Sequence, residues 1–154
     1  MKYAEKTTVP VEKSKAEIEK LLSRYGADQF MSGWDQKKAF IVFRMANRHI
    51  KIVITLPDLN SEKFVKTPAG RKRRHLDSQL KAHEQACRQR WRSLLLRIKA
   101  KLEAIASGDA DFESEFMADI MLPDGKTVGE YLKPEIKAAY ETGKMQKLIP
   151  RFTD

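Results

Sequence analysis

The sequence has few of the residues that mark secreted or membrane-spanning proteins. Cys87 is the one cysteine in 154 residues, so no disulfide can form within the chain. No apolar run approaches the roughly 20 residues that span a bilayer. Residues 1–15 lack the apolar core and small-residue cleavage site of a secretory signal peptide. Together these absences predict a cytoplasmic protein that does not engage a membrane.

Signatures of catalysis are also scarce. The chain has no phosphate-binding glycine loop, no Gly-x-Ser-x-Gly and no Cys–His pair with a polar orienting group. Asp124 and the Glu-Ile-Lys of residues 135–137 match the letters of a metal-dependent nuclease motif. That motif needs its carboxylates and lysine on neighbouring strands, whereas Asp124 is expected in a turn and Glu135 in a helix. We therefore predict a protein that is not an enzyme and uses no cofactor, and keep the nuclease as a third hypothesis.

Candidate metal ligands are few. His83 and Cys87 are four residues apart, the spacing that places two ligands on one helix face, and His75 lies upstream. A tetrahedral zinc site usually needs four such ligands, and the only other histidine is His49. We therefore interpret Cys87 as a small buried apolar residue and predict no metal site.

Positive charge, by contrast, is abundant and unevenly distributed. The chain carries 30 Lys and Arg against 21 Asp and Glu, a formal net charge of +9. Residues 62–102 hold 13 basic and 3 acidic side chains, whereas residues 103–154 hold 6 basic and 11 acidic ones. Such a polarised surface steers polyanions toward one face of a protein. The structural alternatives are a well-solvated helix face and pairing with the acidic third.

The basic region contains the longest predicted helix, over residues 77–107. Its apolar residues recur at three- and four-residue steps, which places them on one stripe of the helix. They are Leu80, Cys87, Trp91, Leu94, Leu95, Ile98, Leu102 and Ile105. Gly108 follows, where a glycine in the left-handed conformation can end a helix. The stripe predicts that Trp91 packs in the core.

A helix and three strands are predicted ahead of it. Ser14 and Glu17 match a capping box, which predicts a helix that begins there and ends near Arg24. Strands are expected over Gln29–Trp34, Ala39–Arg44 and His49–Leu56. Asn47 is expected to take a positive φ in the second turn. Because the last strand alternates between apolar and polar residues, we predict an antiparallel meander with one covered face.

The last third is predicted to be helical. A helix is expected over residues 109–121, with Phe112, Phe116, Met117 and Ile120 on its apolar side. Thr127 and Glu130 match a second capping box, and Pro134 is expected in a first helical turn of a segment that runs to Gly143.

The predicted fold class is α+β, in one domain over residues 1–154. A small three-stranded antiparallel sheet packs on an N-terminal helix and a long central helix, and a helical extension follows. The parts are 1–58 (helix and meander), 59–76 (a basic loop without apolar periodicity), 77–107 (the long helix) and 109–154 (the acidic helical extension).

The strongest candidate site is a group of cations that leads into the long helix and continues along it. A helix N-terminus offers free amides and the positive end of a dipole, and both favour phosphate. Cations spaced along a line would extend such a site into a track for a nucleic-acid backbone. The candidate binding residues are Lys63, Lys66, Arg71, Lys72, Arg73, Arg74, Lys81, Arg88 and Arg92.

Two aromatic residues of the predicted sheet could add base stacking. Trp34 stands at the end of a strand, and Phe40 lies on the strand face opposite Ile41. Stacking on such side chains would favour single strands. We interpret most of these aromatics as core residues and keep stacking as an alternative.

Three stretches resemble a family of small uncharacterised proteins carried by bacteriophages and integrated mobile elements. They are residues 86–92 (ACRQRWR), residues 99–104 (KAKLEA) and residues 122–130 (LPDGKTVGE). The resemblance runs over most of the chain. It implies a bacterial host cell and an accessory role, and it brings no catalytic residues.

The predicted element order is similar to that of double-stranded RNA-binding domains, which also run helix, three-stranded meander, loop and helix. Those domains present lysines at the start of their second helix, where residues 71–74 and Lys81 lie here. The long helix and the acidic third depart from that pattern, and the first strand lacks the expected histidine-containing turn. Since a shared fold does not establish function, the similarity is one of topology.

Two hypotheses of function follow. The first is a non-enzymatic, nucleic-acid-binding accessory protein of a phage or mobile element, which holds DNA or RNA by its phosphate backbone. The alternative is a protein–protein inhibitor, such as an anti-defence factor, that docks the same cationic surface on a host complex. The sequence leaves open DNA or RNA, one strand or two, the oligomeric state, and whether the acidic third covers the basic surface.

Overall fold

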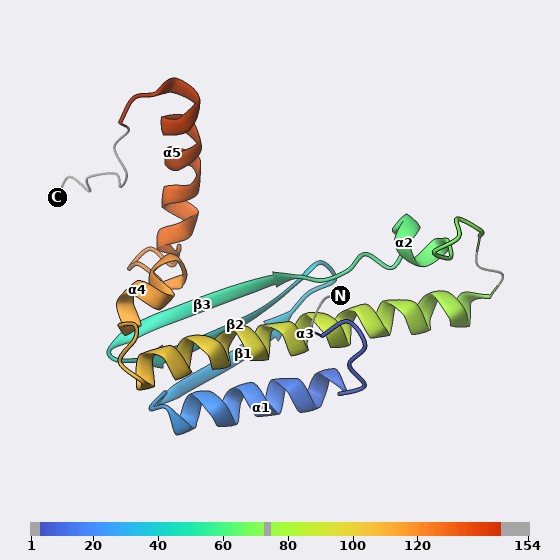
Figure 1. Ribbon diagram of the computed structural model, residues 1–154, viewed down its shortest axis with the longest axis horizontal. Helices are drawn as coiled ribbons and strands as arrows, with labels where there is room; N and C mark the ends of the chain where they lie inside the picture. The colour runs from blue at the N-terminus through green and yellow to red at the C-terminus, as the bar shows by residue number, and fades with distance from the viewer. Residues whose placement is uncertain (1–3, 73–74, 146–154) are drawn as a thin grey trace.

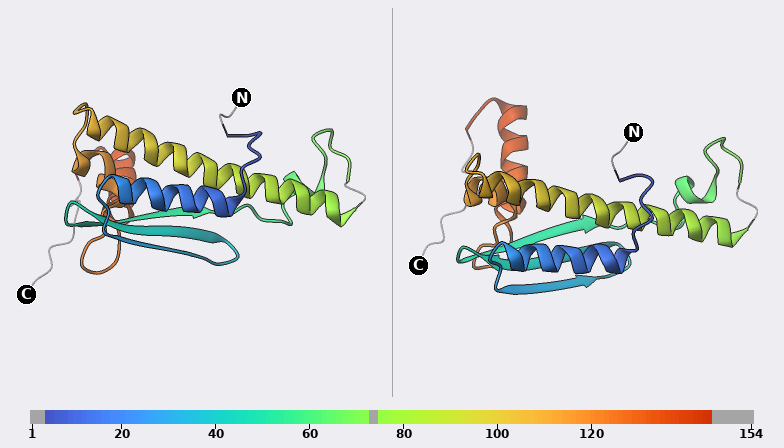
Figure 2. Two further views of the ribbon diagram at one scale, coloured as in Figure 1. Left: turned by 90° about the horizontal axis from the view of Figure 1, so that it is seen from below. Right: turned by 60° about the horizontal axis from the view of Figure 1, so that its bottom comes forward.

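The computed structural model describes residues 4–72 and 75–145. Its elements are α1 (Val11–Arg24), β1 (Gln29–Trp34), β2 (Lys38–Met45), β3 (Arg48–Thr55), α2 (Glu62–Val65), α3 (Leu76–Ala106), α4 (Phe112–Phe116), the 3-10 turn η1 (Met117–Asp119) and α5 (Val128–Thr142). The strands form one antiparallel sheet in the order β1-β2-β3, and α1 and α3 lie on the same face of it (Figures 1 and 2). The α+β class is confirmed. Within the described ranges, no helix is long and apolar enough to cross a bilayer.

The strand register decides which side chains face the helices. Phe43 pairs with Phe30 on β1 and with Ile50 on β3, and cross-strand partners share a face. The inward residues are mostly buried, and the core they form with the helices contains Ile18, Leu22, Ile41, Phe43, Ile50, Ile52, Trp91, Leu94, Ile98, Leu102 and Phe116. The opposite face of the sheet carries no helix (Figure 2). The predicted meander with one covered face is confirmed.

The β2–β3 turn has the backbone expected of a tight hairpin. Asn47 has a φ of 57°, as predicted, and Ala46 precedes it with a φ of 50°. Two consecutive positive φ angles give a turn whose twist matches that of the flanking strands. The turn fixes the register in which Met45 pairs with Arg48.

The start of α1 differs from the capping box predicted at Ser14. The helix begins one turn earlier, at Val11 after Pro10, and the Ser14 amide donates to the Pro10 carbonyl at 3.1 Å. Proline fixes its own φ near the helical value and presets this earlier start. Ser14 is therefore an interior residue, fully buried, and its hydroxyl has no hydrogen-bond partner within the described residues.

We expect Ser14→Ala to stabilise the protein by about 1 kcal/mol, because it removes a buried hydroxyl that gains no hydrogen bond. Urea denaturation followed by circular dichroism would measure the change. Ser23→Ala, at an exposed position of the same helix, controls for the higher helix propensity of alanine. If Ser14→Ala raises the free energy of unfolding no more than Ser23→Ala does, the conclusion that the Ser14 hydroxyl is buried without a hydrogen bond is wrong.

The long helix α3 packs on the sheet with only part of its length. Trp91, Leu95 and Leu102 are buried as predicted, whereas Leu80 is 40% exposed. The 31 residues of α3 extend over about 46 Å, and the eight-residue strands over about 26 Å. The helix therefore overhangs the sheet at its N-terminal end (Figure 1). The predicted apolar stripe has the correct periodicity. The first turns of α3, however, extend beyond the sheet, so the sheet does not bury their apolar residues.

The segment after α3 is less helical than predicted. Asp111 caps α4 by accepting from the Ser114 amide at 3.0 Å, but α4 ends at Phe116, and η1 follows. Ile120 then bridges to Ile50 at the edge of the sheet, and Met121 bridges to Thr127. The extended pairing ends the helix because it ties this part of the chain to β3. The prediction of a helix over residues 109–121 is wrong in its second half.

The capping box at Thr127 and Glu130 is confirmed. The Glu130 amide donates to Thr127 Oγ1 at 3.2 Å, and the Thr127 amide donates to the Glu130 carboxylate at 2.6 Å. Gly143 ends α5 with a φ of 68°. Pro134 lies in the interior of α5 rather than in a first turn, so that prediction is wrong. The helix projects away from the sheet (Figure 1).

Gly129 is where α5 meets the rest of the molecule. A Cβ at this position would lie 2.8 Å from the Ala118 carbonyl oxygen, closer than atoms pack. In an exposed helix Gly→Ala usually stabilises by about 1 kcal/mol. We expect Gly129→Ala to destabilise the docking of α5 by about 1–3 kcal/mol instead, because of overpacking. Amide hydrogen exchange of residues 128–142 would measure the loss of stability of α5. Slower exchange in the variant would refute the close approach of Gly129 to Ala118.

Candidate functional site

The described cations ahead of α3 lie on a segment with a short helix, which differs from the predicted loop over residues 59–76. This segment contains α2, and Phe64 from α2 is only 2% exposed. The Phe64 ring meets the His83 ring edge-on, with centroids 5.4 Å apart. His83 Nε2 lies 2.8 Å from the Pro57 carbonyl, and Gln79 Nε2 donates to the Leu59 carbonyl at 2.8 Å. These contacts hold the segment on the overhanging part of α3.

The chain after α2 closes into a tight turn. Lys66 and Lys72 form a backbone bridge, and the Thr67 amide donates to the Arg71 carbonyl at 2.7 Å. Gly70 has a φ of 79°, and its amide donates to the Thr67 carbonyl at 2.8 Å. The closed backbone brings Lys66, Arg71 and Lys72 together at one end of the molecule.

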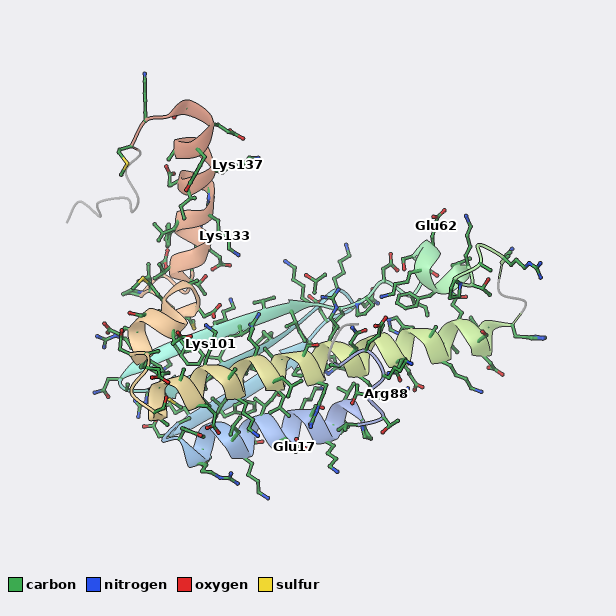
Figure 3. All side chains as sticks on the ribbon, in the orientation of Figure 1. Glu17, Glu62, Arg88, Lys101, Lys133 and Lys137 are labelled. Atoms are coloured by element: carbon green, nitrogen blue, oxygen red, sulfur yellow. The ribbon has the colours of Figure 1, made fainter. Side chains whose placement is uncertain are left out.

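We call this group of exposed cations the basic end, and define it by Lys63, Lys66, Arg71, Lys72 and Lys81. Lys63 lies over the Phe64 ring, with Nζ 5.7 Å from the centroid. Lys66 forms a salt bridge with Glu62, with 3.1 Å between Nζ and Oε1, and the Glu62 side chain is 85% exposed (Figure 3). A solvent-exposed pair of this kind contributes little energy, so an incoming phosphate can compete for the lysine. The predicted residues Arg73 and Arg74 lie outside the described residues.

Two further predicted cations make contacts within the protein. Arg92 Nη1 lies 2.7 Å from Glu17 of α1, and Arg88 donates to Gln85 at 2.6 Å and 3.1 Å. Both arginine side chains are 28% exposed. The Arg92–Glu17 pair ties α3 to α1 beside a groove of about 300 Å³ between the two helices. The predicted line of cations therefore continues toward this groove. Its two arginines, Arg88 and Arg92, already contact other side chains of the protein.

Two hollows lie beside the basic end. One, of about 360 Å³, is enclosed by residues 57–64 and α3, and Lys63 and Arg90 line it. The other, of about 700 Å³, lies between the β1–β2 turn, residues 55–60 and His83. Lys37 and Lys38 line this second hollow. The sheet and the basic end are thus joined by a concave surface that carries cations.

The acidic residues lie at the other end of α3. Residues 109–124 contain six Asp and Glu and no Lys or Arg, and α4 and η1 follow the C-terminus of α3 (Figure 1). About 46 Å of helix separates this region from the basic end. The acidic residues of positions 109–124 therefore do not cover the basic end. The N-terminus of α3 has no side-chain cap at His75, which leaves the positive end of its dipole to reinforce the cations.

Two aromatics that were interpreted as core residues are not fully buried, although Phe40 lies on the strand face opposite Ile41 as predicted. Trp34 is 72% exposed, and Phe40 is half-buried on the face of the sheet without helices. Trp34 does share a face with Ala39, but it lies at the very end of β1. Its neighbours Gly33 and Asp35 were the available signal, since both are poor strand residues. Trp91, in contrast, is 3% exposed, as predicted.

The residues considered as candidate metal ligands do not form a cluster within the described residues. Cys87 Sγ lies 3.9 Å and 4.0 Å from the two ring nitrogens of His83. Asp124 is in a turn, and Glu135 is in α5. Across residues 4–72 and 75–145, no three His, Cys, Asp or Glu side chains are placed to hold a metal ion. Cys87 is half-buried, and this burial raises the pKa of its thiol, with Glu84 adding to the shift and Arg88 opposing it.

We expect Cys87 to react slowly with iodoacetamide at neutral pH. A raised pKa means that a smaller fraction of the thiol is ionised at any pH below it, and the thiolate is the nucleophile. The rate in the native protein should therefore rise at a higher pH than in the urea-unfolded chain. A pH–rate profile with mass-spectrometric readout would test this, and equal or lower midpoints in the native protein would contradict it.

No protein-family model, curated protein or solved structure matches the chain. The resemblance to phage and mobile-element proteins therefore stays a prediction. The same holds for any role shared with double-stranded RNA-binding domains.

Proposed function

We propose that this protein is a non-enzymatic accessory protein that binds the phosphate backbone of a nucleic acid through its basic end. One observation carries the proposal. Four cations, Lys63, Lys66, Arg71 and Lys72, extend from a segment that Phe64 and the Lys66–Lys72 bridge hold in place. Ordered cations lose less conformational entropy on binding than cations on a free chain.

The distribution of charge supports a polyanionic ligand. The basic end is separated from the acidic residues of positions 109–124 by the length of α3, so those residues do not cancel its field. Lys81 extends the cations along α3, and the N-terminus of α3, which the His75 side chain does not cap, adds its dipole. Asp77 and Glu62 are nearby acidic groups, and they limit how closely phosphates can approach. Recognition is therefore mainly electrostatic and weakly dependent on sequence.

The triple variant Lys63→Glu, Arg71→Glu, Lys72→Glu should lower affinity for a labelled 20-nucleotide DNA or RNA by about 100-fold or more at low salt, because it replaces phosphate contacts with repulsion. Fluorescence anisotropy would measure the affinities, with circular dichroism to confirm folding. Retention of wild-type affinity would refute the assignment of the site.

A matched control changes the same amount of charge elsewhere. Lys126→Glu, Lys133→Glu, Lys137→Glu alters three lysines in or beside α5 (Figure 3). This variant should lose much less affinity, since its lysines lie beyond a Debye length of about 10 Å from the basic end. Equal losses in the two variants would mean that net charge, and not the basic end, governs binding.

The salt dependence gives a second test of the wild-type protein. If about five phosphates are engaged, the logarithm of affinity should fall with the logarithm of salt with a slope between about −3 and −5. Absence of binding even at low salt would refute the proposal. The cationic surface would then be better explained by the alternative, an inhibitor that docks on an acidic host protein.

A further inference from the structure

The face of the sheet without helices has a regular arrangement of side chains, which we call the open face. Its four rows across the strands are Gln29 with Arg44 and His49, Met31 with Val42 and Lys51, Gly33 with Phe40 and Val53, and Lys38 with Thr55. Met31 is 56% and Val53 45% exposed. The two middle rows are thus a small apolar area that water reaches.

Phe40 lies at the centre of this area in an unusual position. A Cβ at Gly33 would lie 2.5 Å from Phe40 Cε1 and 3.3 Å from Cε2. Its distance to Cζ would be shorter than either. The far end of the ring therefore covers Gly33 on the neighbouring strand. Only a glycine leaves room for it there. Phe40 is half-buried, so part of its side chain lies over Gly33 and part reaches solvent.

The border of the open face is cationic. Lys51 stands at the end of the row of Met31 and Val42, Lys38 stands in the row beyond Phe40, and neither forms a salt bridge with a described residue. Arg44 is held by Asp28 on the edge of β1, with Nε donating to Oδ1 at 2.8 Å. This contact is also what lowers the pKa of Asp28. None of the positions in the four rows is acidic.

The open face is also continuous with the basic end. Lys38 and Thr55 form its last row, and both line the hollow of about 700 Å³ that reaches residues 55–60 and His83. His83 contacts Phe64, the residue that anchors the segment bearing Lys63. A flexible chain that leaves the open face toward the basic end would pass over this hollow, which Lys37 and Lys38 line together with Asp58.

We propose that the open face binds the unpaired bases of a single-stranded nucleic acid, with one base stacked on Phe40 and phosphates beside Lys51 and Lys38. The inference rests on the proposed function and names its substrate class. Base–aromatic stacking combined with a cationic track is the way in which proteins bind single strands. In a duplex the bases already stack on one another, so a flat ring has no base face to contact.

An apolar protein partner fits this surface less well. An apolar partner would cover Lys51 and Lys38 and leave their charges without water or counterions, which is costly. Phosphates satisfy both lysines while the bases cover Phe40, Met31 and Val53. A nucleotide chain is therefore favoured by three features of the open face. These are the Phe40 ring, the small apolar area of Met31 and Val53, and two lysines, Lys51 and Lys38, that form no salt bridge with a described residue.

The test compares ligands that have equal phosphates but differ in their bases. The wild-type protein is titrated with labelled dT12, with rU12 and with a 12-mer of abasic sites, at one salt concentration. The 12-mer with bases should bind about 5- to 150-fold more tightly than the abasic one, the range for one stacked base. The dT12 and rU12 arms distinguish DNA from RNA as the source of the bases.

Two variants address Phe40 separately. Phe40→Leu keeps an apolar side chain but removes the ring, and Gly33→Ala keeps the ring but forces it from its place. Both should bring the ratio of dT12 to abasic affinity close to one and leave abasic binding unchanged. Tyr140→Leu, which removes an 89% exposed aromatic on α5, should keep the wild-type ratio. Circular dichroism would report whether each variant is folded.

The outcomes separate this inference from the proposed function. Equal wild-type affinity for dT12 and the abasic 12-mer would overturn base stacking and leave phosphate binding intact. A wild-type preference for dT12 that survives both Phe40→Leu and Gly33→Ala would also overturn it, and would point to Trp34. No binding of any 12-mer at low salt would overturn both proposals.

Discussion

The packing of α3 on the sheet is the interaction on which the rest of the structure depends. Ile98 and Leu102 from the helix and Ile41 and Phe43 from the strands are almost completely buried in one cluster. Burial of such side chains is the main favourable term in folding, at about 1.5–3 kcal/mol each. Because the helix is longer than the strands, this packing also determines which parts of the chain project beyond the core.

The overhang gives the molecule its electrical polarity. One end of α3 carries α2 and the turn closed by Lys66 and Lys72, and the other leads into the acidic α4. The contact of Phe64 with His83 shows how the basic segment is fixed although no strand lies beneath it. A cluster of like charges is held together at the cost of repulsion, and a polyanion relieves that repulsion.

Periodicity in the sequence was a good guide wherever one face of an element is buried. The alternation of Ile50, Ile52 and Ile54 predicted β3, and the spacing of Trp91 to Leu102 predicted the buried part of α3. Local signals failed where a competing contact existed. Ser14 matches a capping box, but Pro10 starts the helix earlier, and Glu17 pairs with Arg92 instead.

The sequence by itself determined the α+β class, the meander, the long helix and the concentration of charge in residues 62–102. These depend on side chains that are neighbours in sequence or repeat with a fixed period. Only the tertiary structure decided that Leu80 and Trp34 are exposed, that Arg92 pairs with α1, and that the Phe40 ring covers Gly33. Each of these depends on where one element ends relative to another, which is set by the lengths and register of packed elements and not by any local pattern.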